Sequence, residues 1–134
     1  MNRFKFKYNV YGTLFEVYAI DFCEKSVCVW IDKVSLKGMK LSGSQFDLKN
    51  LIQCTGLKDK NGKLIYEGDI LKAYFENSDT GKTCFEYVPV GYDEEKLAFY
   101  TGKKFRALFA EGYFIPEEYE IAGNIYENQE LLEV

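Results

Sequence analysis

The chain has 134 residues, with 17 basic and 21 acidic side chains, a net charge of -4 and no histidine. The missing histidine excludes Ser-His-Asp and Cys-His catalysis, as well as metal sites that use imidazole ligands. Aromatic residues make up 17% of the sequence, and only two prolines occur. This balance favours strands over helices, in a chain long enough to bury a real core as one domain.

The composition also bears on the cell compartment. No apolar run approaches the roughly 20 residues that a membrane-spanning helix needs, and the charged, aromatic start of the chain does not match a signal peptide. Four cysteines are too few for a secreted disulfide scaffold of this length, and they lack the C-x-x-C spacing of a zinc site. We therefore expect a cytoplasmic protein with reduced thiols, and with no metal, cofactor or membrane partner.

The first half of the chain contains three predicted strands. Residues 3–10 alternate basic and aromatic side chains, which predicts a strand with one basic and one aromatic face. Residues 14–22 and 27–31 are predicted to form a hairpin. The glycines and serines of residues 38–44 predict a loop. Residues 46–53 fit either a strand or a short helix.

Turn signals and short apolar runs alternate in the second half. Asn61 and Gly62 predict a tight turn, because both residues tolerate a positive φ. Gly68 and Asp69 mark the next turn, and a strand is predicted directly after it. The predicted strands of this half are residues 70–75, 85–90, 97–100, 105–109 and 119–126.

Many short strands separated by turn signals predict a mainly β fold, with α+β as the alternative class. The expected architecture is a compact small barrel or sandwich of short antiparallel strands. The Gly-Asp-Ile-Leu sequence at residues 68–71 is similar to the start of an SH3-like barrel, which gives the second half SH3-like character. With no visible linker, residues 1–134 are predicted to form a single domain. Residues 1–53 would form an N-terminal β layer and residues 54–134 a second β unit.

Two longer segments are distinctive. Residues 55–70 read TGLKDKNGKLIYEGDI, and residues 123–132 read GNIYENQELL. They closely resemble the signature block and the closing segment of the YopX family of small phage and prophage proteins. Gln129 takes the place of the family's usual proline, and residues 77–112 have no counterpart in the resemblance. The opening Arg3-Phe4-Lys5-Phe6 is also similar to the family's short basic-aromatic start. The similarity therefore covers both ends of the chain and its middle, about a third of its length.

The resemblance implies a protein of unknown function, encoded by a phage or prophage, that acts in the cytoplasm of a bacterial host cell. It implies homo-oligomers, and it carries over no catalytic residue, cofactor or metal site. The family-signature residues, whose role the resemblance leaves open, are Gly56, Leu57, Asp59, Gly62, Tyr66, Gly68, Asp69, Gly123, Asn124 and Tyr126.

The residue types in the signature are those that turns need. Gly68 would supply backbone freedom at a sharp bend, and Asp69 would bond neighbouring backbone amides in an Asx turn. Tyr66 and Tyr126 would each bury a ring while the hydroxyl keeps a polar partner. We interpret the signature mainly as a specification of the fold, with a binding site as the alternative.

The resemblance, the missing catalytic set and the distribution of charge favour a function in binding rather than catalysis. Residues 1–60 hold ten basic and six acidic side chains, a net of +4, whereas residues 61–134 hold seven and fifteen, a net of -8. Oppositely charged halves could attract each other within a monomer or between subunits, although the simpler interpretation is a mixed surface with an acidic end. The leading hypothesis is a self-assembling protein-interaction module that contacts a host or phage protein, and not an enzyme.

The alternative function is nucleic-acid binding through two basic-aromatic clusters. Their contact residues would be Arg3, Lys5, Lys7, Lys103, Lys104 and Arg106. Such side chains can follow phosphates and stack on bases. The acidic isoelectric point, near 5.0, counts against this hypothesis. A small-molecule or peptide sensor is a third class, for which no residue singles out a ligand.

Overall fold

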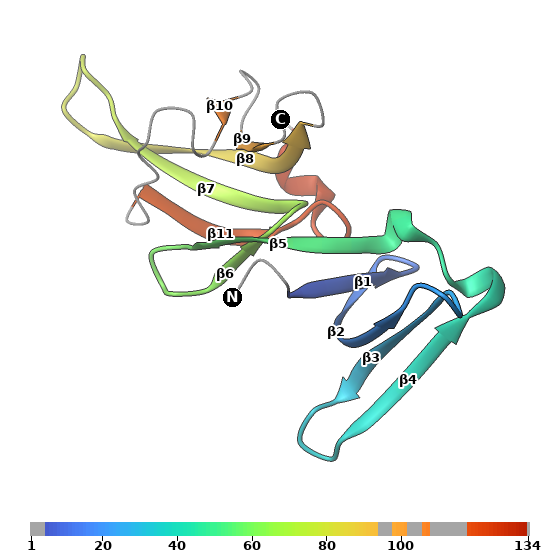
Figure 1. Ribbon diagram of the computed structural model, residues 1–134. Helices are drawn as coiled ribbons and strands as arrows, with labels where there is room; N and C mark the ends of the chain where they lie inside the picture. Colours follow the sequence, from blue (N-terminus) through green and yellow to red (C-terminus); the bar gives the residue numbers. More distant parts are fainter. Residues whose placement is uncertain (1–4, 94–97, 102–105, 108–117, 134) are drawn as a thin grey trace.

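The computed structural model describes residues 5–93, 98–101, 106–107 and 118–133. Its strands form two antiparallel sheets that do not close into a barrel (Figure 1). The mainly β fold that the sequence predicts is confirmed. The described helices are short 3-10 turns at Gly43–Gln45, Leu48–Asn50 and Gln129–Leu132.

The first sheet has six strands in the order β4-β3-β2-β1-β5-β6. Its strands are β1 (Phe6–Val10), β2 (Thr13–Asp21), β3 (Ser26–Asp32), β4 (Lys37–Ser42), β5 (Leu51–Lys58) and β6 (Leu64–Tyr66). The hairpin predicted at residues 14–22 and 27–31 is confirmed as β2 and β3, in which Ala19 pairs with Cys28. All neighbouring strands in this sheet run antiparallel.

The second sheet has five strands in the order β10-β9-β8-β7-β11. Its strands are β7 (Asp69–Glu76), β8 (Thr83–Asp93), β9 (Ala98–Thr101), β10 (Arg106–Ala107) and β11 (Tyr119–Asn124). Strand β11 follows β10 in the chain but pairs with β7 at the opposite edge. The chain passes from the first sheet to the second at Glu67 and Gly68, between β6 and β7.

Strand β4 corrects the prediction of a loop at residues 38–44 for residues 38–42, whereas residues 43 and 44 lie in a 3-10 turn. Gly38 lies inside this strand and is covered by the ring of Tyr18 from β2. A Cβ atom at Gly38 would lie 2.4 Å from the Tyr18 hydroxyl oxygen. A glycine inside a strand often marks such a close approach. Residues 46–53, for which the sequence fitted either a strand or a short helix, contain a 3-10 turn followed by the start of β5.

Each sheet has its own apolar cluster, and a third cluster lies where the sheets meet. The cluster of the six-stranded sheet contains Tyr8, Val27, Val29 and Leu41. The cluster of the five-stranded sheet contains Ile65, Leu71, Val88, Val90 and Phe99. The third cluster contains Ile52, Cys54 and Tyr66, with Tyr126 packed against them. Because Ile65 belongs to β6 and Tyr126 follows β11, both sheets share buried surface.

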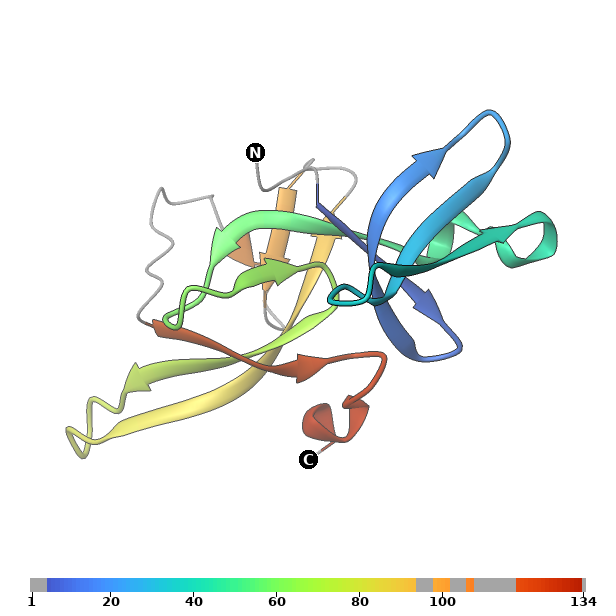
Figure 2. The ribbon, with the colours of Figure 1, turned by 90° about the horizontal axis from the view of Figure 1, so that it is seen from below.

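The two sheets extend in different directions from this junction. In both views, β2 to β4 lie at one end of the molecule and the β7–β8 hairpin lies at the other (Figures 1 and 2). Within the part of the chain that the structure describes, no helix is long and apolar enough to cross a membrane.

Candidate functional site

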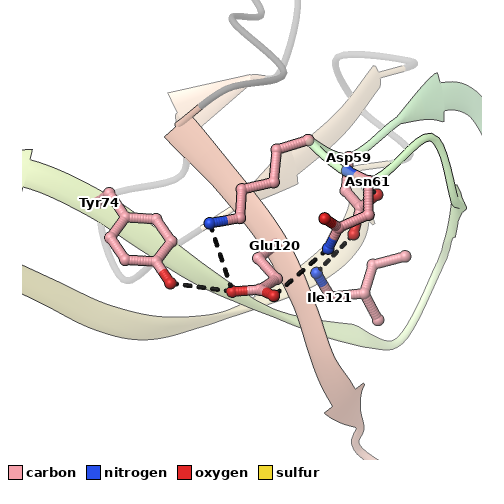
Figure 3. Close-up of polar contacts among 6 residues, drawn as sticks. Asp59, Asn61, Tyr74, Glu120 and Ile121 are labelled. Carbon is pink, nitrogen blue, oxygen red and sulfur yellow. Dashed lines mark hydrogen bonds and ion pairs between the residues drawn. The ribbon is translucent and has the colours of Figure 1, made fainter.

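Asp59 of the signature fastens the loop between β5 and β6 to a distant strand. Its side chain is buried. Its Oδ1 accepts hydrogen bonds from the backbone N–H groups of Asn61 and Lys63, both at 2.9 Å. Its Oδ2 accepts a hydrogen bond at 3.0 Å from the backbone N–H of Ile121 in β11, 62 residues away in sequence (Figure 3). One carboxylate therefore shapes the loop and ties it to the second sheet.

The turn predicted at Asn61 and Gly62 is present, but only Gly62 has a positive φ, of 80°. The Gly62 N–H donates to the Asp59 carbonyl at 3.0 Å, and the Asp59 N–H donates to the Lys63 carbonyl at 2.8 Å. These bonds close a loop over residues 59–63 in which a single residue takes the left-handed conformation. Loops of this kind need glycine at that one position only.

Glu120 of β11 gathers polar side chains beside the same loop (Figure 3). Its carboxylate accepts hydrogen bonds from the Tyr74 hydroxyl at 2.8 Å and from the Asn61 side-chain amide at 3.3 Å. The Lys60 ammonium lies 3.8 Å from this carboxylate. The bond from Tyr74, followed by that from Asn61, holds the pKa of Glu120 below its usual range. The cluster connects β7, β11 and the signature loop at the surface.

Gly68 lies in the turn that joins the two sheets, and no other residue type fits there without strain. Its φ is 88°, and a Cβ atom would lie 2.7 Å from a ring carbon of Tyr126. Its N–H donates to the Val90 carbonyl at 2.8 Å, and its carbonyl accepts from the Ile125 N–H at 2.8 Å. The predicted bend is therefore confirmed, and it is held from both sides by segments far away in sequence.

Asp69 begins β7 with a buried carboxyl group. Its Oδ2 accepts a hydrogen bond at 2.8 Å from the backbone N–H of Tyr66. This bond runs back along the chain, unlike the forward bond of the predicted Asx turn, because the backbone at Asp69 pairs with Asn124 in β11. Burial raises the pKa of Asp69 to about 6, against the smaller lowering effects of the Tyr66 bond and of nearby Lys7 and Lys63.

The two signature tyrosines lie on either side of this turn. Tyr66 is buried, as predicted, and the Lys7 ammonium lies 4.3 Å from the centroid of its ring. Burial raises the pKa of Tyr66 to about 12. Tyr126 is half-buried against Gly68, and burial also raises its pKa. The two rings therefore pack at the junction between the sheets.

Gly56 and Leu57 mark an irregular stretch of β5. The pairing of β5 with β6 shifts register between Cys54 and Lys58, and Gly56 has a φ of 85°. Leu57 packs against the cluster of the five-stranded sheet, although β5 belongs to the other sheet. Cys54 is buried, which raises the pKa of its thiol and opposes the thiolate that a nucleophile needs.

The closing segment forms a turn that is held by two asparagines. Asn124 Oδ1 accepts from the backbone N–H groups of Tyr126 and Glu127, at 3.0 and 2.8 Å. Asn128 Oδ1 accepts from the Asn124 N–H at 3.2 Å and would lie 2.5 Å from a Cβ atom at Gly123. Gln129 then begins a 3-10 turn. Proline suits that position equally, because the first N–H of a helix has no partner within it.

A groove of about 550 Å³ is lined by both sheets, with residues in or beside β1, β2, β3 and β6 of the first sheet and in β7 and β11 of the second. Four lysines line it: Lys5, Lys7, Lys33 and Lys63. Five signature residues also line it: Gly62, Tyr66, Asp69, Gly123 and Asn124. The structure therefore brings part of the signature together around one opening.

The predicted nucleic-acid contacts are divided among different places. Lys5 and Lys7 line the groove, whereas Arg106 belongs to β10 of the other sheet. Arg3, Lys103 and Lys104 lie outside the described residues. Trp30 and Lys33, which no sequence pattern singled out, join Lys5 and Lys7 in the groove. Their spacing carries no signal for this, because one pair lies at β1 and the other at the end of β3.

The comparisons with known proteins agree with this fold. The crystal structure of protein EF1440 from Enterococcus faecalis is similar, with 26% sequence identity and a TM-score of 0.57, over 96% of this chain and 97% of that chain. No curated protein matches this sequence significantly. The family described as YopX protein matches residues 10–133, which is nearly the whole chain. This chain therefore belongs to the YopX family.

Proposed function

We propose that the protein acts by binding, as a self-assembling module of a phage or prophage, and that it is not an enzyme. In this proposal it contacts a host or phage protein in the cytoplasm of a bacterial cell. The resemblance of its signature to phage and prophage proteins supports the origin. One observation carries the proposal of self-assembly: the hairpin of β3 and β4 exposes apolar side chains at the edge of its sheet.

The exposed apolar side chains lie in and beside the turn of this hairpin. Val34 and Leu36 are 95% and 74% exposed, and Ile31 is 56% exposed. Leu36 also has a positive φ, of 56°, which costs a residue with a side chain roughly 1 kcal/mol or more. Three exposed apolar side chains at one hairpin are better explained by a contact with a partner than by folding of the monomer.

A second copy of this chain is the partner that fits this surface best. Strand β4 is the outer strand of its sheet, and within the described residues it pairs only with β3. The free side of an edge strand can pair with the same strand of another copy. The net charges of +4 and -8 on the two halves of the sequence add attraction between copies.

Gel filtration with light scattering tests the assembly. We expect the wild-type chain to exceed the monomer mass at micromolar concentration, and the double variant Val34→Asp with Leu36→Asp to become a monomer. Leu48→Asp is the control, because Leu48 is also apolar and exposed, at 58%, but lies in the 3-10 turn before β5. A wild-type chain that is strictly monomeric would contradict the proposal.

Several observations support binding without catalysis. The sequence has no histidine, and the Cys54 thiol is buried with a raised pKa. Among the described residues, no three Cys, Asp or Glu side chains lie together in a way that could hold a metal ion. A pull-down from host lysate tests the partner: we expect one protein to be recovered both with and without nuclease treatment.

Nucleic-acid binding is a second candidate function. One exposed face of the five-stranded sheet favours it. Tyr74, Phe85 and Tyr87 form a row of rings, with centroids 6.3 and 5.5 Å apart. The Lys72 ammonium lies 4.0 Å from the centroid of Phe85. Such a row can stack bases beside a cation that contacts phosphate. Binding to a fluorescent single strand should weaken steeply with salt, and a flat salt response would exclude this candidate.

A further inference from the structure

The groove between the sheets has the size of a site for a small ligand. Its volume of about 550 Å³ is within the usual range of small-molecule sites, which is roughly 300 to 1,000 Å³. Both sheets contribute walls, so a ligand there would touch β1 to β3 as well as β7 and β11. Sites at such junctions are common because two rigid elements can hold a ligand between them.

The charges in the groove favour an anion. Four lysines line it against two carboxylates, Glu16 and Asp69. Glu16 forms an ion pair with Lys33, and Asp69 is buried and accepts a backbone hydrogen bond. Lys5 and Lys63 form no ion pair with any residue that the structure describes. A positive groove in a chain of net charge -4 is a local feature, and it concentrates small anions.

The aromatic side chains in the lining are a second feature that bears on the kind of ligand. Trp30, Tyr66 and Phe6 all line the groove. The Lys7 ammonium lies over the ring of Tyr66, and the ring of Trp30 lies 4.1 Å from that of Tyr18, between centroids. Aromatic side chains beside charged groups give an organic molecule a surface to contact that a bare ion would not use. Lysine is a common ligand of phosphate in such sites.

We propose that this groove binds a small organic phosphate with a planar apolar part, the chemistry that a mononucleotide carries. Lys5 and Lys63 contact the phosphate, and the ring of Trp30 contacts the planar part. Asp69 is the charge that opposes this ligand, because Glu16 is already neutralised by Lys33. The signature residues around the groove then serve both the fold and the ligand.

Trp30 is the single tryptophan of the chain, so its fluorescence reports directly from the groove. The full-length protein would be titrated with adenosine and uridine monophosphates, with the two nucleosides, and with inorganic phosphate at constant ionic strength. We expect at least one monophosphate to change the fluorescence saturably, and to bind about tenfold more tightly than its nucleoside or phosphate alone, because each half supplies part of the binding energy.

Three variants make the test specific. The double variant Lys5→Ala with Lys63→Ala should weaken binding of the monophosphate about tenfold or more, because two charged contacts are lost. Its matched control is Lys25→Ala with Lys49→Ala, two exposed lysines outside the groove, which should leave the affinity unchanged. Asp69→Asn keeps an acceptor for the Tyr66 N–H but removes the opposing charge, and should tighten binding severalfold. Misfolding cannot produce that gain.

Three results would overturn the proposal. One is no saturable response to either monophosphate, and another is an equal loss of affinity in both lysine pairs. The third is a single-stranded oligonucleotide that binds this groove much more tightly than any monophosphate, which would assign it to nucleic acid. None of these results depends on self-assembly, which gel filtration measures separately.

Discussion

Aspartates shape turns in two regions of this molecule, with similar bonds and different surroundings. In the N-terminal layer, Asp21 Oδ1 accepts from the backbone N–H groups of Cys23 and Glu24, both at 2.9 Å, at an exposed site. In the signature loop, Asp59 makes bonds of the same length to local amides. Asp59 is buried, however, and it also reaches Ile121 in the other sheet.

The difference between these aspartates teaches what the signature encodes. In an exposed turn, water can replace the side chain as the hydrogen-bond partner of the backbone amides, so the side chain adds little stability. A buried amide that loses its partner has no water to replace it, and the fold is destabilised by the full desolvation penalty. The signature residues are concentrated where the two sheets meet. The β2–β4 layer has its own apolar cluster and needs no such connection. The signature therefore describes the junction more than either sheet.

Removing the two aspartates in turn is the strongest test of this comparison. Asp59→Ala should lower the free energy of unfolding by about 4 kcal/mol, since three bonds from buried or partly buried amides to a charged acceptor each contribute about 1.5 kcal/mol. Asp21→Ala, the matched control, should cost less than about 1 kcal/mol because its amides stay hydrated. Urea unfolding followed by Trp30 fluorescence measures both. Equal effects would contradict the distinction.

Two glycines with positive φ sharpen the same comparison. Gly68→Ala should cost about 3 kcal/mol, because it combines a strained backbone with overlap against Tyr126. Gly81→Ala has a similar strain, with a φ of 67°, but nothing lies within 4 Å of its Cβ position. It should cost only about 1 kcal/mol. The same urea experiment decides, and a large effect at Gly81 would remove the role assigned to the Tyr126 ring.

The buried Asp69 gives the junction a dependence on pH. Its pKa of about 6 in the folded chain lies above the ordinary value of 3.8, so the folded state holds the proton more tightly than the unfolded state does. Its contribution to stability is therefore complete below pH 3.8 and is lost as the pH rises through 6. Between pH 4 and pH 7, wild type should lose about 2 kcal/mol relative to Asp69→Asn. Parallel pH profiles would show that Asp69 does not titrate in this way.

The smallest effect is expected at the surface cluster of Glu120. Glu120→Gln keeps an acceptor for the Tyr74 hydroxyl but removes the attraction to Lys60. Exposed pairs of this kind contribute little and are screened by salt. The variant should differ slightly from wild type at low ionic strength and not at all in 1 M salt, an estimate that follows from the Debye length. A difference that persists in high salt would place this cluster among the buried connections.

Sequence reasoning succeeded where the signal is local. The hairpin of β2 and β3 and the bends at Gly62 and Gly68 follow from alternation and from glycine at turns. It failed at β4, because Gly38 in isolation indicates a loop. Only the folded chain shows that the Tyr18 ring fills the space beside this glycine. A partner from another strand thus overrides a local preference.

The distant partner of Asp59 and the walls of the groove could not be predicted for the same reason. Nothing near Asp59 in sequence indicates Ile121 as its partner. Lys5, Trp30 and Lys63 come from three separate segments, so their proximity depends on the order of strands in the sheet. That order is decided by long-range pairing, for which a single sequence carries little signal.

The hydrogen bond between Asp59 and Ile121 also bears on the order in which the parts of the chain fold during synthesis. During synthesis, all the strands of the six-stranded sheet emerge before β7, so that sheet can pair while the rest is being made. The five-stranded sheet cannot be completed until β11 has been synthesised and has paired with β7, because contacts distant in sequence form late. Until then Asp59 lacks its distant partner, and one side of β7 is unpaired. A ribosome that pauses between β10 and β11 would therefore hold a half-finished molecule, exposed to chaperones and to other nascent chains.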